Sequence, residues 1–237
     1  MSDSGHSFPE WTPPEIISAY SEKNVNALFE WQAEVLKWAE ANGDNIVYCA
    51  PTSAGKSIVA ELIALRVALS GKKVLFLLPY VSVAKEKLRF LQRAWRRLDI
   101  QMAAFIGAQS APSREWTAAV CTTEKANSLL NHAMMDGSMD VFGECVAIYL
   151  RNRTDYFEGL IVIDELHMVF DSSRGVVLES LCAKINLWNL RNPTAKIRVI
   201  GMSATLENLV SVGKWLHAKV FETHFRPVGL NERICCE

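Results

Sequence analysis

The sequence predicts an α/β fold in which a doubly wound parallel sheet carries helices on both faces. Short uninterrupted apolar runs alternate along the chain with longer segments of helical periodicity, and such runs are typical of strands buried on both faces. The first of these runs leads directly into a glycine-containing loop and then a helix. Half of the 237 residues are hydrophobic, so the chain is long enough to bury a sizeable core.

The overall composition narrows the classes of protein to consider. The formal net charge is -1, so any nucleic-acid surface must come from local clustering of basic residues. The six cysteines form no C-x-x-C pair and have no histidine partners at zinc spacing, and we expect buried, reduced thiols. No basic leader with an apolar core opens the sequence, and no apolar stretch approaches about 18 residues. We therefore expect neither secretion nor a membrane span.

The N-terminal part is predicted to be a polar tail followed by two helices. Residues 1–10 are polar, and we expect them to be disordered. A short helical segment begins at Pro13-Pro14, and a longer one covers residues 28–39 and ends before Gly43. Gln32 lies beside the apolar stripe of the second helix. Its amide has both a donor and an acceptor and could pair with the edge of an adenine, although such a glutamine is commonly a solvated helix residue.

A phosphate loop is predicted between the apolar run 46–49 and a helix from Lys56 to about residue 69. The loop reads Ala50-Pro51-Thr52-Ser53-Ala54-Gly55-Lys56-Ser57. Backbone N–H groups of such a loop and of the following helix N-terminus form a cup for a polyphosphate. Lys56 would reach the terminal phosphates, and the Ser57 hydroxyl would reach a Mg²⁺ ion. The first residue is alanine where this pattern commonly has glycine, and an ordinary helix start is the alternative interpretation.

After the loop the alternation of strand and helix continues. The predicted strands cover residues 74–78, 102–105 and 119–121, and the predicted helices cover 83–98 and 124–135. Ligands in sheets of this kind bind at the carboxyl ends of the strands, where the phosphate loop also lies.

The helix predicted over residues 83–98 separates an apolar stripe from a basic face. The basic residues recur at steps of four and three and are Lys85, Arg89, Arg93 and Arg96, with Arg97 beside them. Such a face could follow a phosphate backbone, or it could simply be solvated.

The most apolar predicted strand, residues 159–163, runs directly into Asp164-Glu165-Leu166-His167. Two carboxylates at the end of a buried strand are costly unless a metal ion or hydrogen bonds stabilise them. Beside a phosphate loop, Asp164 would hold the Mg²⁺ shell and Glu165 would orient and polarise the attacking water. The alternative is that the pair caps the next helix.

The C-terminal part completes the alternation. A helix follows Gly175, a strand covers 197–200, a last helix covers 208–216 and a last strand covers 219–222. Two hydroxyl residues, Ser203 and Thr205, follow the strand at 197–200 and could hydrogen-bond the carboxylates after residue 163 and sense the phosphate.

These stretches together resemble the Ski2-like branch of superfamily 2 helicases. The motifs that carry the resemblance are LFEWQ, APTSAGKS, PYVSVAKEK, CTTEKAN, DELH and GMSAT, in this order. Within the branch the motif sequences are most similar to those of the helicase-like domains of the DNA polymerase theta family, and the HELQ-type repair helicases are next. The resemblance covers nearly everything from about Trp11 to the C-terminus.

The resemblance implies a RecA-like ATP-binding domain over residues 28–230 and a role for each motif. It places Gln32 on adenine, Thr52 to Ser57 on phosphates and Mg²⁺, and Asp164 and Glu165 on metal and water. Ser203, Thr205 and His167 would couple hydrolysis to movement, and Lys56 would contact ATP. The resemblance also implies that four residues of the PYVSVAKEK and CTTEKAN motifs contact the backbone of a nucleic-acid strand: Ser82, Lys85, Thr122 and Thr123. The family also implies a nuclear protein of DNA repair.

Two departures from the family limit the expected domain. Motifs of a second RecA-like domain do not follow Glu237, so we expect the first motor domain only, preceded by an extension over 1–27 and followed by the start of the missing domain at 231–237. We likewise expect no polymerase domain within this sequence. Residues 144–158 intervene where relatives pass almost directly into the DELH strand, and they are either an inserted surface hairpin or translated non-coding sequence.

The leading hypothesis is the ATP-binding half of a DNA-dependent ATPase and helicase-like motor that uses ATP and Mg²⁺. Its partner would be single-stranded or partially duplex DNA. The alternatives are a Ski2-like RNA helicase fragment and a non-catalytic module that binds ATP and nucleic acid. A small-molecule kinase is a further alternative, but a kinase does not require the strand-contacting motifs. We expect the isolated chain to bind ATP and to hydrolyse it poorly.

Overall fold

A computed structural model describes residues 5–107, 116–135, 159–193 and 196–228. Within these residues seven strands form one sheet in the order β3-β4-β2-β5-β6-β1-β7, and every neighbouring pair is parallel. From β1 the chain passes to β2 and the edge strand β3, then returns through β4, β5 and β6 to β7 on the other side of β1, and this reversal of direction is typical of a doubly wound sheet. The predicted fold class is therefore confirmed.

The elements follow the predicted alternation of strand and helix. The strands are β1 (Asn45–Cys49), β2 (Val74–Leu78), β3 (Met102–Phe105), β4 (Ala118–Thr122), β5 (Gly159–Ile163), β6 (Ile197–Ser203) and β7 (Ala218–Glu222). The helices are α1 (Pro14–Ser21), α2 (Glu30–Asn42), α3 (Lys56–Leu69), α4 (Val81–Ala94), α5 (Thr123–Met135), the 3₁₀ helix η1 (Leu166–Phe170), α7 (Gly175–Arg191) and α8 (Leu209–Trp215).

Three predicted elements have bounds in the structure that differ from the prediction in a way that affects the site. Helix α4 begins at Val81 rather than residue 83 and ends at Ala94 rather than residue 98. Strand β6 continues to Ser203, three residues beyond its predicted end, because the small residues there still pair with β1. Helix α5 begins at Thr123, directly after β4 ends at Thr122.

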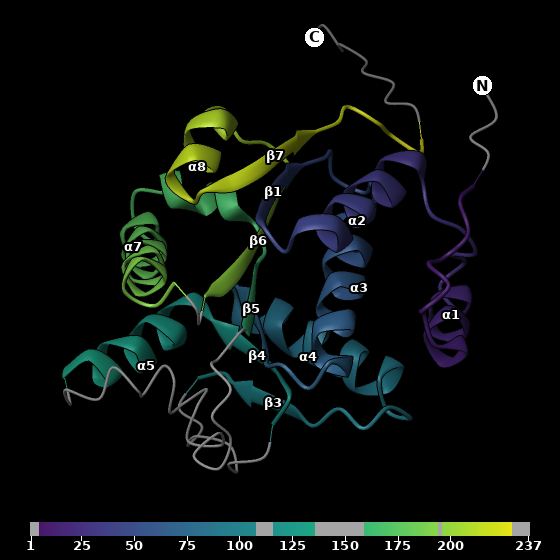
Figure 1. Ribbon diagram of the computed structural model, residues 1–237, viewed down its shortest axis with the longest axis horizontal. Helices are drawn as coiled ribbons and strands as arrows, with labels where there is room; N and C mark the ends of the chain where they lie inside the picture. Colours follow the sequence, from purple (N-terminus) through teal and green to yellow (C-terminus); the bar gives the residue numbers. More distant parts are fainter. Residues whose placement is uncertain (1–4, 108–115, 136–158, 194–195, 229–237) are drawn as a thin grey trace, which may run out of the picture.

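Helices cover both faces of the sheet (Figure 1). Helices α1 to α4 lie on one side and α5, α7 and α8 on the other. Successive strand residues point to opposite faces, so neighbouring residues such as Phe76 and Leu77 enter different cores. This explains why the strands read as continuous apolar runs.

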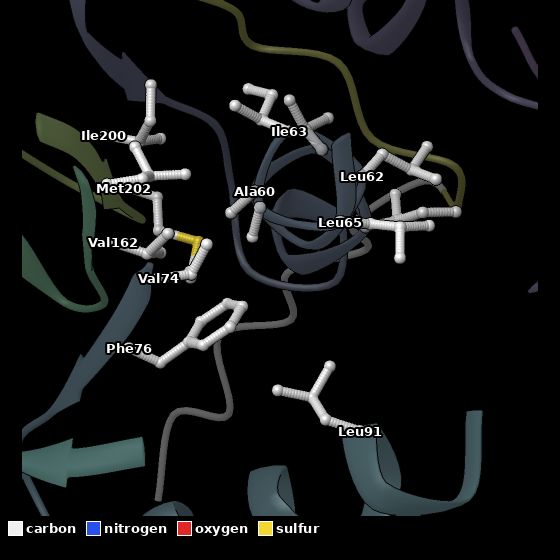
Figure 2. Close-up of a cluster of buried hydrophobic side chains, with 14 of the residues drawn as sticks. Ala60, Leu62, Ile63, Leu65, Val74, Phe76, Leu91, Val162, Ile200 and Met202 are labelled. Atoms are coloured by element: carbon white, nitrogen blue, oxygen red, sulfur yellow. The ribbon is translucent and has the colours of Figure 1, made fainter. Parts of the chain in front are cut away.

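The core on the α3 side of the sheet contains closely packed aliphatic and aromatic side chains (Figure 2). Ala60 and Ile63 of α3 approach Ile200 and Met202 of β6, and Leu91 of α4 lies beyond Phe76. The ring of Phe76 also lies 6.2 Å, centroid to centroid, from the ring of Trp95. Helix α3 is thus fixed against the strands whose ends form the site.

The N-terminal segment is ordered where the structure describes it, so the prediction of disorder over residues 1–10 is wrong for residues 5–10. The backbone N–H and C=O of His6 both bond to Leu28, at 2.8 and 2.7 Å. The buried ring of Phe8 stacks on Tyr20 with centroids 6.0 Å apart. One aromatic side chain within a polar stretch therefore anchors it. The predicted insertion at 144–158 and the C-terminal residues 231–237 lie outside the described residues.

No helix in the described ranges is both long enough and apolar enough to cross a membrane. Cys49, Cys121 and Cys182 are buried and free, as predicted for these three. Burial raises the pKa of Cys182 to about 12.

Phe76→Ala should lower the free energy of unfolding by about 3–5 kcal/mol, because it empties a site between α3, α4 and Trp95. Urea denaturation followed by circular dichroism measures the change. Leu190→Ala is the control, because Leu190 is 79% exposed and its loss should change stability by less than about 0.5 kcal/mol. Equal effects of the two substitutions would contradict the packing described here.

Candidate nucleotide-binding site

The phosphate loop connects β1 to α3 through two residues with left-handed backbone. Ser53 has φ +66° and Gly55 has φ +82°, and Gly55 is the N-cap of α3. A Cβ on Gly55 would lie 2.5 Å from Nε2 of Gln32, closer than two such atoms can approach. Glycine is therefore required at this position by both its φ angle and its neighbour.

Gln32 supports this loop with its side-chain amide. The side chain is 2% exposed, and Nε2 donates to the carbonyls of Gly55 at 3.0 Å and of Ala54 at 3.4 Å. Oε1 accepts the backbone N–H of Phe29 at 2.8 Å, so the Gln32 side chain also bonds back to the N-cap residue of α2. The interpretation of Gln32 as a solvated helix residue is therefore wrong. Both of its N–H donors are used by the loop.

Lys56 lies over the loop, where its ammonium group donates to two loop carbonyls. Nζ is 2.9 Å from the oxygen of Ala50 and 3.0 Å from that of Pro51. Burial lowers the pKa of Lys56, and the carboxylates of Glu165 and Asp164 partly oppose this shift. A bound phosphate would offer stronger acceptors than these carbonyls, because both partners would then be charged.

Asp164 follows β5 directly and is fixed by backbone bonds. Its N–H donates to Leu77 of β2 at 3.0 Å, and its Oδ1 accepts the N–H of Glu165 at 2.9 Å. Burial raises the pKa of Asp164, and the charge of Lys87 is the largest effect that opposes it. The structure brings Asp164 together with Lys56, as the motif order predicts.

Glu165 has an unusual backbone and a carboxylate oxygen without a hydrogen bond. Its φ is +53°, in the region that costs energy for a residue with a side chain. Oε2 is buried, makes no hydrogen bond and lies 3.3 Å from Nδ1 of His167. An acceptor in this state can take a hydrogen bond from a water molecule.

Ser203 connects His167 to the end of β6. Its hydroxyl donates to the carbonyl of Thr205 at 2.7 Å and lies 3.1 Å from Nδ1 of His167, so it can accept a proton that Nδ1 carries. We expected Ser203 and Thr205 to bond the carboxylates after β5. In the structure the Ser203 hydroxyl contacts His167 of DELH instead. Thr205 takes part only through its backbone carbonyl, which accepts the Ser203 hydroxyl, and Thr205 itself is exposed.

Part of this site lines one cavity of 690 Å³. Ser53, Gly55, Ser57, Gln32 and Asp164 all line it. No cluster of three or more His, Cys, Asp or Glu side chains occurs in the part of the chain that the structure describes. A divalent cation here would therefore need oxygens from a bound phosphate or water, which is how Mg²⁺ is commonly held.

The residues predicted to contact a strand lie at the same edge of the sheet. Leu78 pairs with Thr122 across β2 and β4, so the starts of α4 and α5 are neighbours. Ser82 and Lys85 are exposed on α4, Thr123 is half-buried, and Thr122 is only 5% exposed. The basic side chains of the predicted helix over 83–98 are all exposed: Lys85, Arg89, Arg93, Arg96 and Arg97.

The sequence analysis did not single out three buried polar residues beside this cavity. The Tyr20 hydroxyl donates to Glu61, and Nζ of Lys87 lies 2.6 Å from Oε1 of the same carboxylate. Burial alone would lower the pKa of Lys87, but the charge and hydrogen bond of Glu61 outweigh it and raise that pKa. The sequence did contain one signal: Glu61 lies on the apolar helix after the phosphate loop, and a buried carboxylate requires a hydrogen-bond or ionic partner.

Comparison with known proteins agrees with this geometry. The sequence profile of the DEAD/DEAH box helicases matches residues 29–212, which is most of the chain. The chain belongs to the DEAD/DEAH box helicase family. The matched range runs from Phe29, beside Gln32, through the phosphate loop and DELH to α8.

The curated relatives of this helicase domain are named as DNA polymerase theta or as helicases. It is 49% identical to DNA polymerase theta of Caenorhabditis elegans over 99% of the chain and 14% of that protein. It is 33% identical to human helicase POLQ-like, over 93% of the chain and 19% of that protein. It is 32% identical to the ATP-dependent DNA helicase Hel308 of Pyrobaculum calidifontis, over 92% of the chain and 28% of that protein. The helicase domain thus spans less than a third of each relative.

Solved structures show the same fold at lower identity. The helicase domain superposes on the DUF1998 helicase MrfA bound to DNA and AMPPNP with a TM-score of 0.71 and 20% identity. The superposition covers 97% of the chain and 32% of MrfA. At this identity the likeness supports the fold alone.

Asp164→Asn should stabilise the metal-free helicase domain at neutral pH by about 0.5–2 kcal/mol, because it removes a buried charge beside Glu165. The pKa of Asp164 is raised above its ordinary 3.8, so the native state favours the protonated form. The gain should be absent below about pH 3.8, should grow as pH rises from there to the native pKa, and should stay constant above it. Thermal melts in EDTA across pH 3–8 would measure it.

Asp171→Asn is a matched control with the opposite sign. Asp171 accepts bonds from Ser173 and Arg174, and these bonds hold the pKa of its carboxyl below 3.8. Its contribution to stability is present above pH 3.8 and is lost as pH falls through the lowered pKa, so the substitution should destabilise at neutral pH. The same sign for both variants would refute this assignment.

Proposed function

We propose that this helicase domain is the ATP-binding half of a DNA-dependent ATPase motor that acts in DNA repair. One observation supports the proposal above all. The phosphate loop from β1 and Asp164 after β5 line the same cavity, although more than 100 residues separate them in sequence. A structural carboxylate pair would not need a phosphate loop opposite it.

The residues at the cavity fit a Mg·nucleotide. Lys56 and the N–H groups at the start of α3 would contact the phosphates, and Ser57 and Asp164 would hold the Mg²⁺ ion. Bound Mg·ATP would supply the phosphoanhydride bond that water cleaves. Glu165 would orient that water through Oε2, the buried oxygen without a hydrogen bond. His167 and Ser203 would then connect the site to the end of β6 and couple hydrolysis to movement, with Thr205.

Gln32 would act on the nucleotide in two ways. Its Nε2 fixes the loop through Gly55, and its Oε1 keeps one lone pair after accepting the N–H of Phe29. That lone pair can accept from the amino group of an adenine, so a base contact remains part of the proposal.

The nucleic-acid contacts would lie at the starts of α4 and α5. Ser82 and Lys85 are exposed there, and Thr123 is beside them with Thr122 beneath. Names of the relatives, which include DNA polymerase theta and an ATP-dependent DNA helicase, favour DNA over RNA. We therefore propose single-stranded or partially duplex DNA as the partner and a nuclear location.

The domain organisation is also part of the proposal. Residues 28–230 would form the RecA-like ATP-binding domain, with 1–27 as an extension, 144–158 as an insertion and 231–237 leading into a second RecA-like domain. Arginines from that domain would stabilise the charge that develops during hydrolysis, an effect worth roughly 10³-fold or more in rate. A polymerase domain further along would complete the likeness to polymerase theta.

The chain should bind a fluorescent ATP analogue with Mg²⁺ and hydrolyse ATP slowly. Lys56→Ala should weaken binding by about 1.5–3 kcal/mol, because it removes a charged hydrogen-bond donor from the phosphates. Glu165→Gln should leave binding within about threefold and reduce any turnover by roughly 10²-fold or more. Fluorescence titration and phosphate release measure the two quantities.

Two results would contradict this assignment. Unchanged binding by Lys56→Ala would show that the phosphate loop is not the site. Brisk turnover by the isolated chain would show that no second domain is needed. Measurable affinity with no turnover, even with DNA present, would favour the second candidate, a non-catalytic module that binds ATP and nucleic acid.

The names of the relatives favour DNA, so a single-stranded DNA oligonucleotide should compete better for the chain than RNA of the same sequence. Fluorescence anisotropy with unlabelled competitors measures the preference. Lys85→Met should weaken binding of both strands and reduce the salt dependence by about one charge. Stronger competition by RNA would favour an RNA helicase of the Ski2 type.

A further inference from the structure

Glu61 is a buried carboxylate whose two oxygens are bonded by side chains from two other helices. It lies one turn after Ser57 on α3 and is 3% exposed. The hydroxyl of Tyr20, from α1, donates to Oε2. The ammonium of Lys87, from α4, donates to Oε1 at 2.6 Å. A carboxylate this deeply buried is destabilising unless paired, so these bonds fix the three helices relative to one another.

Lys87 also faces the nucleotide site directly. Its side chain is 12% exposed and lines the cavity together with Ser57 and Asp164. The acidic groups beside it are Glu61, which it contacts, and Asp164 and its chain neighbour Glu86, which act on it through their charge. A nucleotide that enters or leaves the cavity would therefore change the charges around the Lys87 ammonium group, which is hydrogen-bonded to Glu61 of α3.

The opposite side of the same helix carries the proposed strand contacts. Residues two apart on an α-helix point about 200° apart, so Lys85 and Lys87 lie on different faces. Lys85 is exposed, as is Ser82 at the start of α4. Helix α4 thus presents one lysine to solvent and one to the nucleotide cavity.

We propose that Lys87 is a positioning residue that couples the nucleotide site to the strand-contacting face of α4 through its buried ion pair with Glu61. Ser82, Lys85 and Lys87 all belong to this one helix of 14 residues, so a shift of its Lys87 side would also move Ser82 and Lys85. Coupling of this kind is a free energy shared by two sites, and it is reciprocal: bound nucleotide changes strand affinity as much as bound strand changes nucleotide affinity. This inference rests on the proposed function.

The test measures the affinity of the full chain for a single-stranded DNA oligonucleotide with and without Mg²⁺ and a non-hydrolysable ATP analogue. For the wild-type chain the two dissociation constants should differ by about fivefold or more. For Lys87→Met they should agree within about twofold, with the analogue kept at a saturating concentration for each variant. The ratio of the two constants is a quantity that a merely structural residue would not change.

Three further variants separate coupling from folding. Lys87→Met leaves the Glu61 carboxylate unpaired, so the double variant with Glu61→Gln removes both charges and should fold while still lacking the coupling. Lys87→Arg keeps a charged donor and should keep a larger ratio than Lys87→Met. Lys85→Met should weaken DNA binding equally in both conditions and leave the ratio unchanged.

Each outcome supports or overturns the inference. Loss of the ratio in Lys87→Met and in the folded double variant, with its retention in Lys85→Met, supports it. The inference is overturned if the folded double variant keeps the same ratio as the wild-type chain. It is also overturned if the wild-type chain binds the analogue but its two dissociation constants for DNA are equal. Both outcomes leave the proposed function intact. Failure of the wild-type chain to bind the analogue overturns both.

Discussion

Backbone hydrogen bonds between the parallel strands β5, β6 and β1 bring the phosphate loop and the DELH carboxylates to one edge of the sheet. Cys49 pairs with Ser203, and the N–H of Ala50 donates to the carbonyl of Ser203 at 3.1 Å. Ile163 pairs with Gly201 on the other side of β6. A slip of one residue in either pairing would turn each strand's side chains to the opposite core, so the two hydrophobic cores fix the register that the site requires.

The fold class and the phosphate-loop and DELH motifs could be predicted from the sequence, because both depend on short local patterns of residues. Apolar runs of five residues and a loop ending in Gly55-Lys56-Ser57 are visible without any tertiary information. The contact between Tyr20 and Glu61 joins residues 41 apart, and no periodicity reports it. The burial of Gln32 and the anchoring of the N-terminal segment by Phe8 likewise depend on which helices meet in space. Local pattern predicts elements and motifs, whereas side-chain partners across elements come from packing.

The site combines a rigid framework with local strain. Glu165 adopts a left-handed backbone, and Asp164 is a carboxylate that burial disfavours. Such features persist where the surrounding structure over-determines them, and they are typical of functional sites. Here the surroundings are the buried strand β5, the tightly bonded loop and the triad of Tyr20, Glu61 and Lys87. The stable core of the sheet therefore tolerates unfavourable groups at one edge.

The packed core of this domain extends toward the N-terminus beyond the range that the helicase profile matches. The helicase profile begins at residue 29, yet Phe8 and Tyr20 are part of the main core. A chain begun at the first shared residue would leave the Glu61 carboxylate without its hydroxyl partner and would uncover the aromatic side of α4 at Phe90. The helicase profile thus marks the range of the shared motifs, while the packed core of this domain extends at least to Phe8, more than 20 residues earlier.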